Sequence, residues 1–473
     1  MGEEITVTDF LPDDFQRFQE RLRDETALAA DWYQAGRFEN ERYVLGFEVE
    51  AWLLDHNYYP NSINERFLST LDDPLVVPEL SRFNVELNCL PVTVGGDTFS
   101  HAEKELEALW RRCNATAHGM DANMVMIGTL PTVREEDLSL GNMSPLKRYH
   151  ALNTEVLRQR GGRPLRIDIS GADHLAAEHG DVMLEAATTS FQVHLMVPAS
   201  LAHHYYNASL AVAGPALASA VNAPFLFGKL LWDETRIPLF EQAVDLKGRG
   251  GEARRVTFGS SYLAHDLLEC FRENLHEFPV LLPLCFDQGP DAQRHLQLHN
   301  GTIWRWVRPL LGFSDSGQPH LRIEFRVLPA GPTILDMIAN AAFYVGVIHQ
   351  LVGRRFNEDG ALAFDDAQAN FYAAARSGLD ARLVWPGAGE VGARELLLEE
   401  LIPTARAGLA ALEVDDDDRD RYIGVVENRV THGQTGAAWQ KAGFEDCGRD
   451  FFRLMAAYCE RQRSGIQVSQ WKI

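Results

Sequence analysis

The chain lacks the patterns of secreted, disulfide-bonded or zinc-binding proteins. Its 473 residues include six dispersed cysteines, none of which form a C-x-x-C pair. The amino end, Met1 to Glu4, has no basic segment followed by an apolar one, as a secretory signal would have. These absences predict reduced thiols and a cytoplasmic protein. The cysteines are Cys89, Cys113, Cys270, Cys285, Cys447 and Cys459.

Positive charge is also scarce. The formal net charge of −23 argues against nucleic acid or an anionic membrane as the main partner, although a local group of arginines could still bind ATP. The most apolar stretch, residues 208–231, is interrupted by Pro215, Asn222, Pro224 and Lys229. It therefore predicts a buried helix followed by a turn, and no membrane span.

Short catalytic motifs are missing as well. The sequence contains no Walker loop, no G-x-S-x-G element and no catalytic cysteine motif, and the glycines at 248–251 (GRGG) are too few for a dinucleotide fingerprint. Any chemistry must therefore come from residues that are separated in the sequence and brought together by the fold.

Four segments place polar residues two positions apart, with apolar residues between them. Residues at i and i+2 share one face of a β-strand, so the pattern predicts four strands of one antiparallel sheet, with a polar face. A solvated face alone produces such alternation, but here four glutamates recur without a lysine and would repel one another. The polar residues are Glu48, Glu50, Glu86, Asn88, Gln192, His194, Arg322, Glu324 and Arg326.

This face has the composition of a site for Mg²⁺ and phosphate. Glu48 and Glu50 offer hard oxygen ligands, and Glu86 and Glu324 could complete one or two Mg²⁺ sites. Arg326 could neutralise a transferring phosphoryl group, or it could form an ion pair with a neighbouring glutamate. His194 could bind metal or phosphate, or it could be a structural histidine.

Further cations lie outside these strands. Arg148 is at the start of a helix expected over 147–160, where free NH groups would favour an anion. Arg236 belongs to a stretch that also contains Lys229, Arg254 and Arg255. Each of these residues taken alone is more often a solvated surface group.

The order of elements predicts an α+β fold with helices packed on the outer face of the sheet. We expect an N-terminal helical arm (1–40), a catalytic part (41–335) and a mainly helical remainder of the same unit (336–473). A helix of about 30 residues is expected from Phe99, and a loop-rich functional cover over 228–300. The run from Asp415 to Asp418 is interpreted as a turn or helix start, not a metal site.

Six segments, in order, resemble the glutamate–cysteine ligase family, in the branch that includes plant and bacterial enzymes and bacterial carboxylate–amine ligases. They are LGFEVEAWLLD (45–55), PELSRFNVELNCLPV (78–92), SPLKRYHALN (144–153), TTSFQVHLMVP (188–198), NAPFLFGKLLWDETRIPLFEQ (222–242) and LRIEFRVLPAGPT (321–333). RVTHGQTGAAW (429–439) is similar to a C-terminal segment of the family that closes over the site.

The resemblance implies the catalytic fold of glutamine synthetase, a curved antiparallel sheet that forms a funnel. It implies that ATP phosphorylates a carboxylate, typically the γ-carboxylate of glutamate, and that an amine such as cysteine then attacks the acyl phosphate. Mg²⁺, or Mn²⁺, would bridge the phosphates. By match, the metal ligands would be Glu48, Glu50, Glu86 and Glu324. The residues that contact nucleotide, phosphate or substrate would be Gln192, His194, Arg148, Arg236 and Arg326, with Asn88 and Arg322 on the same face.

The sequence departs from the family pattern in its second acidic strand. This strand reads RFNVELN where plant-type enzymes have G-G-Q-F-E-L, which keeps the glutamate and changes its surroundings.

Two other functions remain open from the sequence. A catalytically idle relative that binds nucleotide or amino acid is one alternative. A phosphotransferase of the guanidine kinase type is the other. The acceptor amine and the oligomeric state, possibly a homo-oligomer, are not determined by the sequence.

Overall fold

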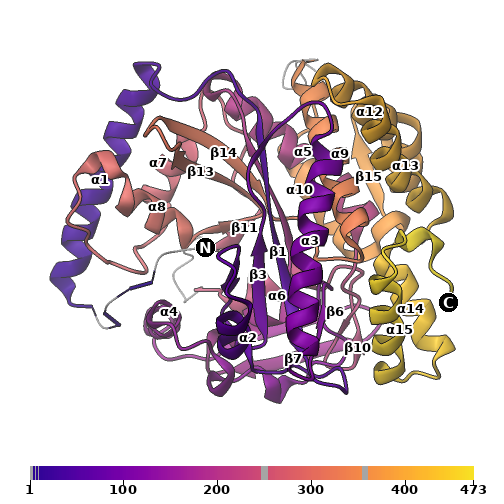
Figure 1. The fold of residues 1–473 in the computed structure, drawn as a ribbon. Helices are drawn as coiled ribbons and strands as arrows, with labels where there is room; N and C mark the ends of the chain where they lie inside the picture. The colour runs from indigo at the N-terminus through magenta and orange to yellow at the C-terminus, as the bar shows by residue number, and fades with distance from the viewer. Residues whose placement is uncertain (1–3, 6, 9, 247–253, 354–360) are drawn as a thin grey trace.

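The computed structural model describes residues 4, 5, 7, 8, 10–246, 254–353 and 361–473, so the glycines at 248–251 lie outside the described residues. An antiparallel sheet runs through the middle of the molecule in the order β13-β14-β8-β1-β3-β2, and β4 and β5 also pair with β1 (Figure 1). Its strands are β1 (Val44–Leu54), β2 (Val76–Pro78), β3 (Asn84–Asn88), β4 (Val92–Thr93), β5 (Asn123–Val125), β8 (Phe191–Met196), β13 (Val307–Phe313) and β14 (Pro319–Phe325).

The four polar-faced strands are direct neighbours in this sheet, as predicted. Glu50 lies opposite Glu86, Glu48 opposite Gln192, and Glu324 opposite His194. This register places the polar residues of all four strands on one face. The sequence prediction missed β13, which contains a proline. Because β13 is an edge strand, a missing backbone donor is tolerated there.

Smaller two-stranded sheets surround the main one. They pair β6 (Leu165–Ser170) with β7 (His174–His179), β9 (Phe225–Leu226) with β10 (Lys229–Leu230), β11 (Val256–Thr257) with β12 (Trp304–Arg305), and β15 (Arg382–Trp385) with β16 (Gly389–Gly392).

Helices cover the apolar face of the main sheet. Helices α5 and α9 contact its strands, and α10, α12 and α13 pack on these two helices farther out (Figure 1). The helices are α1 (Pro12–Gln34), α2 (Asn64–Leu71), α3 (Thr98–His118), α4 (Lys147–Gln159), α5 (Ala202–Ala220), α6 (Arg236–Ala243), α7 (Leu268–Glu277), α8 (Arg294–Gly301), α9 (Ile334–Gly353), α10 (Phe364–Ser377), α11 (Ala393–Leu396), α12 (Ile402–Ala411), α13 (Asp416–His432), α14 (Gly436–Asp446) and α15 (Phe451–Arg463).

The two helices next to the sheet are apolar on all sides because protein surrounds them. Helix α5 is the buried helix expected within 208–231, and it ends at Ala220 before Asn222 and Pro224. Helix α9 is long and apolar enough to span a membrane, but 83% of its most apolar window is buried within the protein. A buried core helix passes the same test of length and composition, so α9 is weak evidence for a span.

One length prediction was wrong. Helix α3 has 21 residues, not about 30, and ends at His118 before Gly119. The described part of the stretch 228–300 is loop-rich, as expected, but it also contains α6, α7 and most of α8, which were not predicted. These helices have only 8 to 10 residues, and segments this short depend on tertiary packing more than on their own periodicity.

The acidic run Asp415 to Asp418 begins α13, as expected. The Asp418 carboxylate also accepts hydrogen bonds from the backbone NH groups of Phe99 and Ser100, at 3.0 and 2.9 Å. One carboxylate thus caps the amino end of α3 and joins it to α13.

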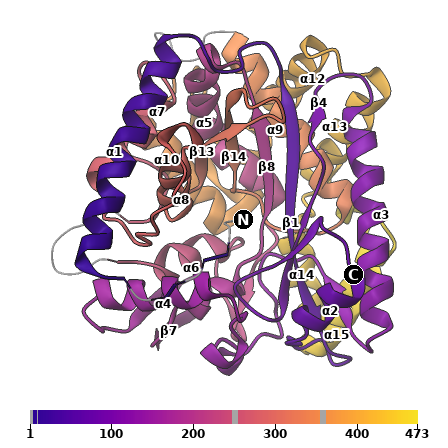
Figure 2. The same ribbon diagram turned by 60° about the vertical axis from the view of Figure 1, so that its left-hand side comes forward.

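The N-terminal helix α1 packs on α7 and α8. Figure 2 shows α1 and α3 on opposite flanks of the sheet. His295 of α8 contacts Glu25 of α1, with Nδ1 and Oε1 2.6 Å apart, and both side chains are buried. The division of the chain into an arm, a catalytic part and a helical part stays a prediction.

Candidate active site

The polar face of the sheet carries a compact cluster of three carboxylates, from Glu50, Glu79 and Glu86. One oxygen of each lies within 4.8 Å of the others, and no other group with this spacing of potential metal ligands occurs among the described residues. Glu50 and Glu86 are cross-strand partners, whereas Glu79 directly follows the edge strand β2. Sequence reasoning quoted the segment that contains Glu79 but did not select it, because it precedes the alternating pattern.

Burial disfavours the ionised form of the carboxylates in this cluster. Burial and the charges of Glu48 and Glu50 raise the pKa of Glu86 to about 7. Burial and the same kind of repulsion raise the pKa of Glu79 well above its usual range. Burial also raises the pKa of Glu50, although Arg326 opposes it. Three such carboxylates are costly to ionise together unless a cation joins them.

Glu48 is on the same face and lies against a histidine of the neighbouring strand. His194 Nε2 lies 3.2 Å from Glu48 Oε1. Burial alone would raise the pKa of Glu48, but the facing His194 outweighs it and lowers the pKa to about 2. Glu48 is therefore ionised and paired across β1 and β8.

Glu324 is held by two arginines. Arg308 donates to Oε2 through Nε at 3.1 Å and through a terminal nitrogen at 2.7 Å, and Arg326 donates to Oε1 at 2.6 Å. Burial opposes ionisation of Glu324, but the two guanidinium groups outweigh it and hold the pKa far below its usual range. Arg308, on the strand that the sequence prediction missed, was not foreseen.

Gln192 links the acidic cluster to the arginines. Its Nε2 donates to Glu50 Oε1 at 3.0 Å, and its Oε1 accepts from Arg326 at 2.7 Å. Ser190 fixes the same carboxylate through its backbone NH at 2.7 Å and its hydroxyl at 3.0 Å. Only one orientation of the Gln192 amide lets its oxygen accept from Arg326 and its nitrogen donate to Glu50. Gln192 therefore holds the Glu50 carboxylate beside the Arg326 guanidinium.

Two small pockets open beside these residues, with about 240 and 220 Å³ of empty space. Both are lined by Glu50, Glu185 and Thr188. One extends to Ser190, Arg236, Phe240, Trp306 and Arg326, and the other to Glu79, Leu80, Asn84, Ala186 and Thr189. Sequence reasoning did not select Glu185, which has no alternating pattern around it.

The comparisons with known proteins agree with the family resemblance seen in the sequence. The family model described as glutamate-cysteine ligase family 2 (GCS2) matches residues 44–449. The chain belongs to glutamate–cysteine ligase family 2. This membership confirms the resemblance seen in the sequence, and with it the expectation of an amide-forming ligase.

Two solved structures are similar to this member of the glutamate–cysteine ligase family. Glutamate–cysteine ligase from Francisella tularensis, in complex with AMP, is 13% identical and has a TM-score of 0.56, with 90% of each chain covered. A bifunctional glutathione synthetase from Pasteurella multocida is 12% identical with a TM-score of 0.47, over 89% of this chain and 52% of that one. The first of these confirms the curved antiparallel sheet with helices on its outer face. No curated protein matches the chain.

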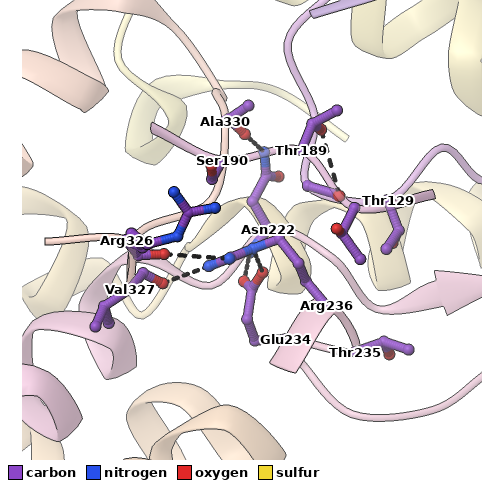
Figure 3. A network of polar contacts seen from close by, with 12 residues as sticks. Thr129, Thr189, Ser190, Asn222, Glu234, Thr235, Arg236, Arg326, Val327 and Ala330 are labelled. Carbon is purple, nitrogen blue, oxygen red and sulfur yellow. Dashed lines mark hydrogen bonds and ion pairs between the residues drawn. The ribbon is translucent and has the colours of Figure 1, made fainter. Parts of the chain in front are cut away.

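In this family member, Arg236 is bound within the protein (Figure 3). Its Nε donates to Glu234 at 3.1 Å, and its two terminal nitrogens donate to the carbonyls of Arg326 and Val327. The Arg236 side chain is only 2% exposed. It lines the first pocket while fixing the backbone that carries Arg326.

Arg148 and the amino end of α4 are also bound by other groups of this chain. Arg148 donates to the Tyr149 hydroxyl at 3.0 Å, and that hydroxyl donates to the Pro78 carbonyl at 3.2 Å. The backbone NH of Lys147 donates to Glu4 Oε1 at 2.6 Å. The helix end that was expected to favour an anion therefore holds a carboxylate of this chain.

The remaining predicted residues lie around the cluster. Asn88 donates to Glu86 Oε1 at 3.0 Å. Arg322 makes no hydrogen bond or ion pair with the described residues, and burial lowers its pKa although Glu48 and Glu324 oppose this. Arg322 is therefore a guanidinium on the polar face with capacity for a ligand.

The segment 429–439 does not line either pocket. Arg429 is buried and pairs with Asp336 at 2.8 Å. Just after the segment, Gln440 donates to the side chain of Asn222 at 2.8 Å, and the Asn222 backbone NH donates to Glu234 at 2.9 Å. Within the segment, the backbone NH of Ala437 donates to the Val221 carbonyl, so the segment packs on the loop that contains Asn222, and its closure over the site stays a prediction.

Proposed function

We propose that the chain is an ATP- and Mg²⁺-dependent carboxylate–amine ligase. It activates the γ-carboxylate of glutamate as an acyl phosphate, which an amine then attacks, and cysteine is the first amine to test. The observation that carries this proposal is the pairing of a buried three-carboxylate cluster with Arg326, through Gln192, on the polar face. Membership of the family supports it.

The residues present fit a divalent cation. Glu50, Glu79 and Glu86 offer closely spaced oxygen ligands, and burial and mutual repulsion raise the pKa of each. Mg²⁺ or Mn²⁺ prefers oxygen ligands of this kind and, when bound, would neutralise phosphate charge. Glu48 already lies against His194, and Glu324 against two arginines, so they are the outer members of the predicted metal set.

Arg326 is suited to the phosphoryl transfer. A donor carboxylate oxygen attacks the γ-phosphorus of ATP, the bond to the bridging oxygen breaks, and ADP leaves. Arg326 makes both of its hydrogen bonds to described residues through one terminal nitrogen, and the rest of its guanidinium is available for a phosphate oxygen. A fixed guanidinium beside the transferred group stabilises charge in the transition state without reorganisation.

The second step forms the amide. The amine nitrogen attacks the carbonyl carbon of the acyl phosphate, the bond from that carbon to the phosphate oxygen breaks, and phosphate leaves while the nitrogen loses a proton. Exclusion of water during this step would protect the acyl phosphate from hydrolysis.

The test is phosphate release from ATP and Mg²⁺ with L-glutamate and a panel of amines that includes cysteine, with mass spectrometry of the products. A γ-glutamyl amide together with free phosphate is expected. A phosphorylated guanidine would instead identify a phosphotransferase. ATP binding without turnover across all donors and amines would contradict the ligase and leave an idle binding protein.

A further inference from the structure

The segment 326–330 leads from the end of β14 towards α9 and carries Arg326. The backbone NH of Arg326 donates to the Trp306 carbonyl at 3.0 Å. The carbonyl of Leu328 accepts from the backbone NH of Phe191, in β8, at 3.0 Å. The position of the Arg326 guanidinium on the polar face therefore depends on how this segment is held.

Two buried side chains hold the carbonyl groups of this segment (Figure 3). Arg236 donates through its two terminal nitrogens to the carbonyls of Arg326 and Val327. Asn222 donates through Nδ2 to the carbonyl of Ala330 at 2.8 Å. Together with the contacts to Trp306 and β8, these bonds restrain the segment along its length.

Glu234 connects the two side chains that hold the segment. Its Oε1 accepts from Arg236 Nε at 3.1 Å, and its Oε2 accepts from the backbone NH of Asn222 at 2.9 Å. The Glu234 side chain is fully buried. Because a carboxylate bound at Nε fixes the plane of a guanidinium, Glu234 directs both terminal nitrogens of Arg236 at the segment.

Glu234 borders neither of the described pockets, whereas Arg236 and Arg326 both line the first one. Any influence of Glu234 on turnover must therefore pass through these arginines. Gln192 and Glu324 hold the Arg326 side chain through a single terminal nitrogen. The other fixed point of Arg326 is its backbone, and Arg236 supplies part of that restraint.

We propose that Glu234 is a positioning residue for phosphoryl transfer, because it fixes Arg236 against the segment 326–330 and thereby sets the Arg326 guanidinium. This inference rests on the proposed function, in which Arg326 binds the transferred group. A displacement of about 1 Å at such a group lowers turnover by up to about 100-fold, even when the substitution lies away from the chemistry. Glu234 touches no substrate in this scheme, so its loss acts on kcat and not on KM.

The test is a double-mutant cycle of Glu234→Gln and Arg326→Lys, read on phosphate release and amide formation with ATP, L-glutamate and the amine. The substituted amide keeps the shape of the side chain but turns a donor towards Arg236 Nε or the Asn222 NH. Burial raises the pKa of Glu234 to about 7, although Arg236 opposes it, so assays at about pH 8 compare the amide with the ionised carboxylate. In Glu234→Gln we expect kcat to fall about 10-fold, with each KM within about twofold of wild type.

The double variant separates a positioning role from a purely structural one. We expect its kcat to equal that of Arg326→Lys alone, because the group that Glu234 positions has already been removed. Losses that multiply in the double variant would overturn the proposal, as would a wild-type kcat in Glu234→Gln. If Glu234→Gln does not fold, Glu234→Asp takes its place in the cycle and decides in the same way, since its shorter carboxylate keeps the charge but cannot reach both partners.

Asp336→Asn is the matched control. Asp336 is also a fully buried carboxylate that pairs with an arginine, Arg429, at 2.8 Å. None of the hydrogen bonds of its side chain to described residues involves the segment 326–330. We expect Asp336→Asn to lower the thermal stability about as much as Glu234→Gln does, and to leave kcat of the folded protein near wild type. An equal loss of kcat in Asp336→Asn would overturn the proposal, because any loss of stability would then reduce turnover.

The same assays separate this inference from the ligase itself. A wild-type protein that forms no amide with any donor and amine refutes the proposed function, and with it this inference. A wild-type protein that forms the amide, while the two substitutions act independently on kcat, refutes the positioning role of Glu234 and leaves the ligase standing.

Discussion

Arg326, the residue just after β14, donates a hydrogen bond of 2.6 Å to Glu324, two residues before it in the chain. Both side chains point to the polar face of the sheet, and Arg308 binds the other carboxylate oxygen of Glu324. Glu324 thus holds Arg326 in place beside the pocket that Glu50 also lines. The ion pair considered from the sequence is present, and it positions the arginine for a phosphate.

Glu50→Gln is expected to abolish Mg²⁺-dependent turnover and to leave the fold intact. The substituted amide would keep the shape of the side chain but would remove a charged metal ligand. Burial raises the pKa of Glu50, so a neutral side chain is tolerated there, but the amide keeps only one of the two oxygens that accept from Ser190 and Gln192. We therefore expect a small loss of stability with the fold retained. Phosphate release against Mg²⁺ concentration, together with thermal melting, checks this. Wild-type rates in the variant would refute the metal assignment.

Arg326→Lys and Arg308→Lys form a matched pair, because both arginines bind Glu324 but only Arg326 borders a described pocket. We expect Arg326→Lys to lower kcat about 100-fold, as loss of one transition-state donor does. Arg308→Lys should lower kcat much less and act mainly on stability. Steady-state kinetics and denaturation of both variants test this, and equal losses of kcat would contradict it.

Arg236→Leu is expected to act on stability. Removing a buried arginine leaves the Glu234 carboxylate and two backbone carbonyls without their donor, which costs about 3–5 kcal/mol of unfolding free energy. Urea denaturation measures the loss. If the variant unfolds at the wild-type midpoint and loses only its affinity for ATP or glutamate, Arg236 is a ligand-binding residue and the structural assignment is wrong.

The acidic cluster should make the metal-free protein sensitive to pH. The pKa of Glu86 is raised from an ordinary 4.5 to about 7, so the native state binds this proton more tightly than the unfolded chain does. The resulting stabilisation is complete below the unfolded pKa and is lost as pH rises through the native one. Between about pH 5 and pH 8 we expect the unfolding free energy to fall on the order of 3 kcal/mol.

Denaturation across this pH range, with EDTA or with excess Mg²⁺, measures the effect. Mg²⁺ binds the ionised form, so it should restore stability at high pH and flatten the profile. Glu86→Gln should reduce the slope without metal but leave part of it, because burial also raises the pKa values of Glu50 and Glu79. If the unfolding free energy of the wild-type protein in EDTA does not change with pH, ionisation of the cluster does not destabilise the native state.

The sequence by itself determined the four polar-faced strands. Residues at i and i+2 of a strand share one face, so alternating polar and apolar residues predict a strand with one polar face. It therefore placed Glu48, Glu50, Gln192 and Glu324 on a common face, and the register of β1, β8 and β14 agrees. The order of the motifs also determined the family, since six weak matches in sequence are jointly specific.

Only the tertiary structure decided which of these groups meet. Glu79 and Glu185 lie outside any alternating segment and reach the site through an edge strand and a short 3-10 helix. Arg308 comes from an edge strand that its proline concealed. Which glutamate faces a histidine, an arginine or other glutamates depends on strand order and on distances of a few ångströms. Local patterns do not encode these, because they arise only when segments far apart in the chain pack together.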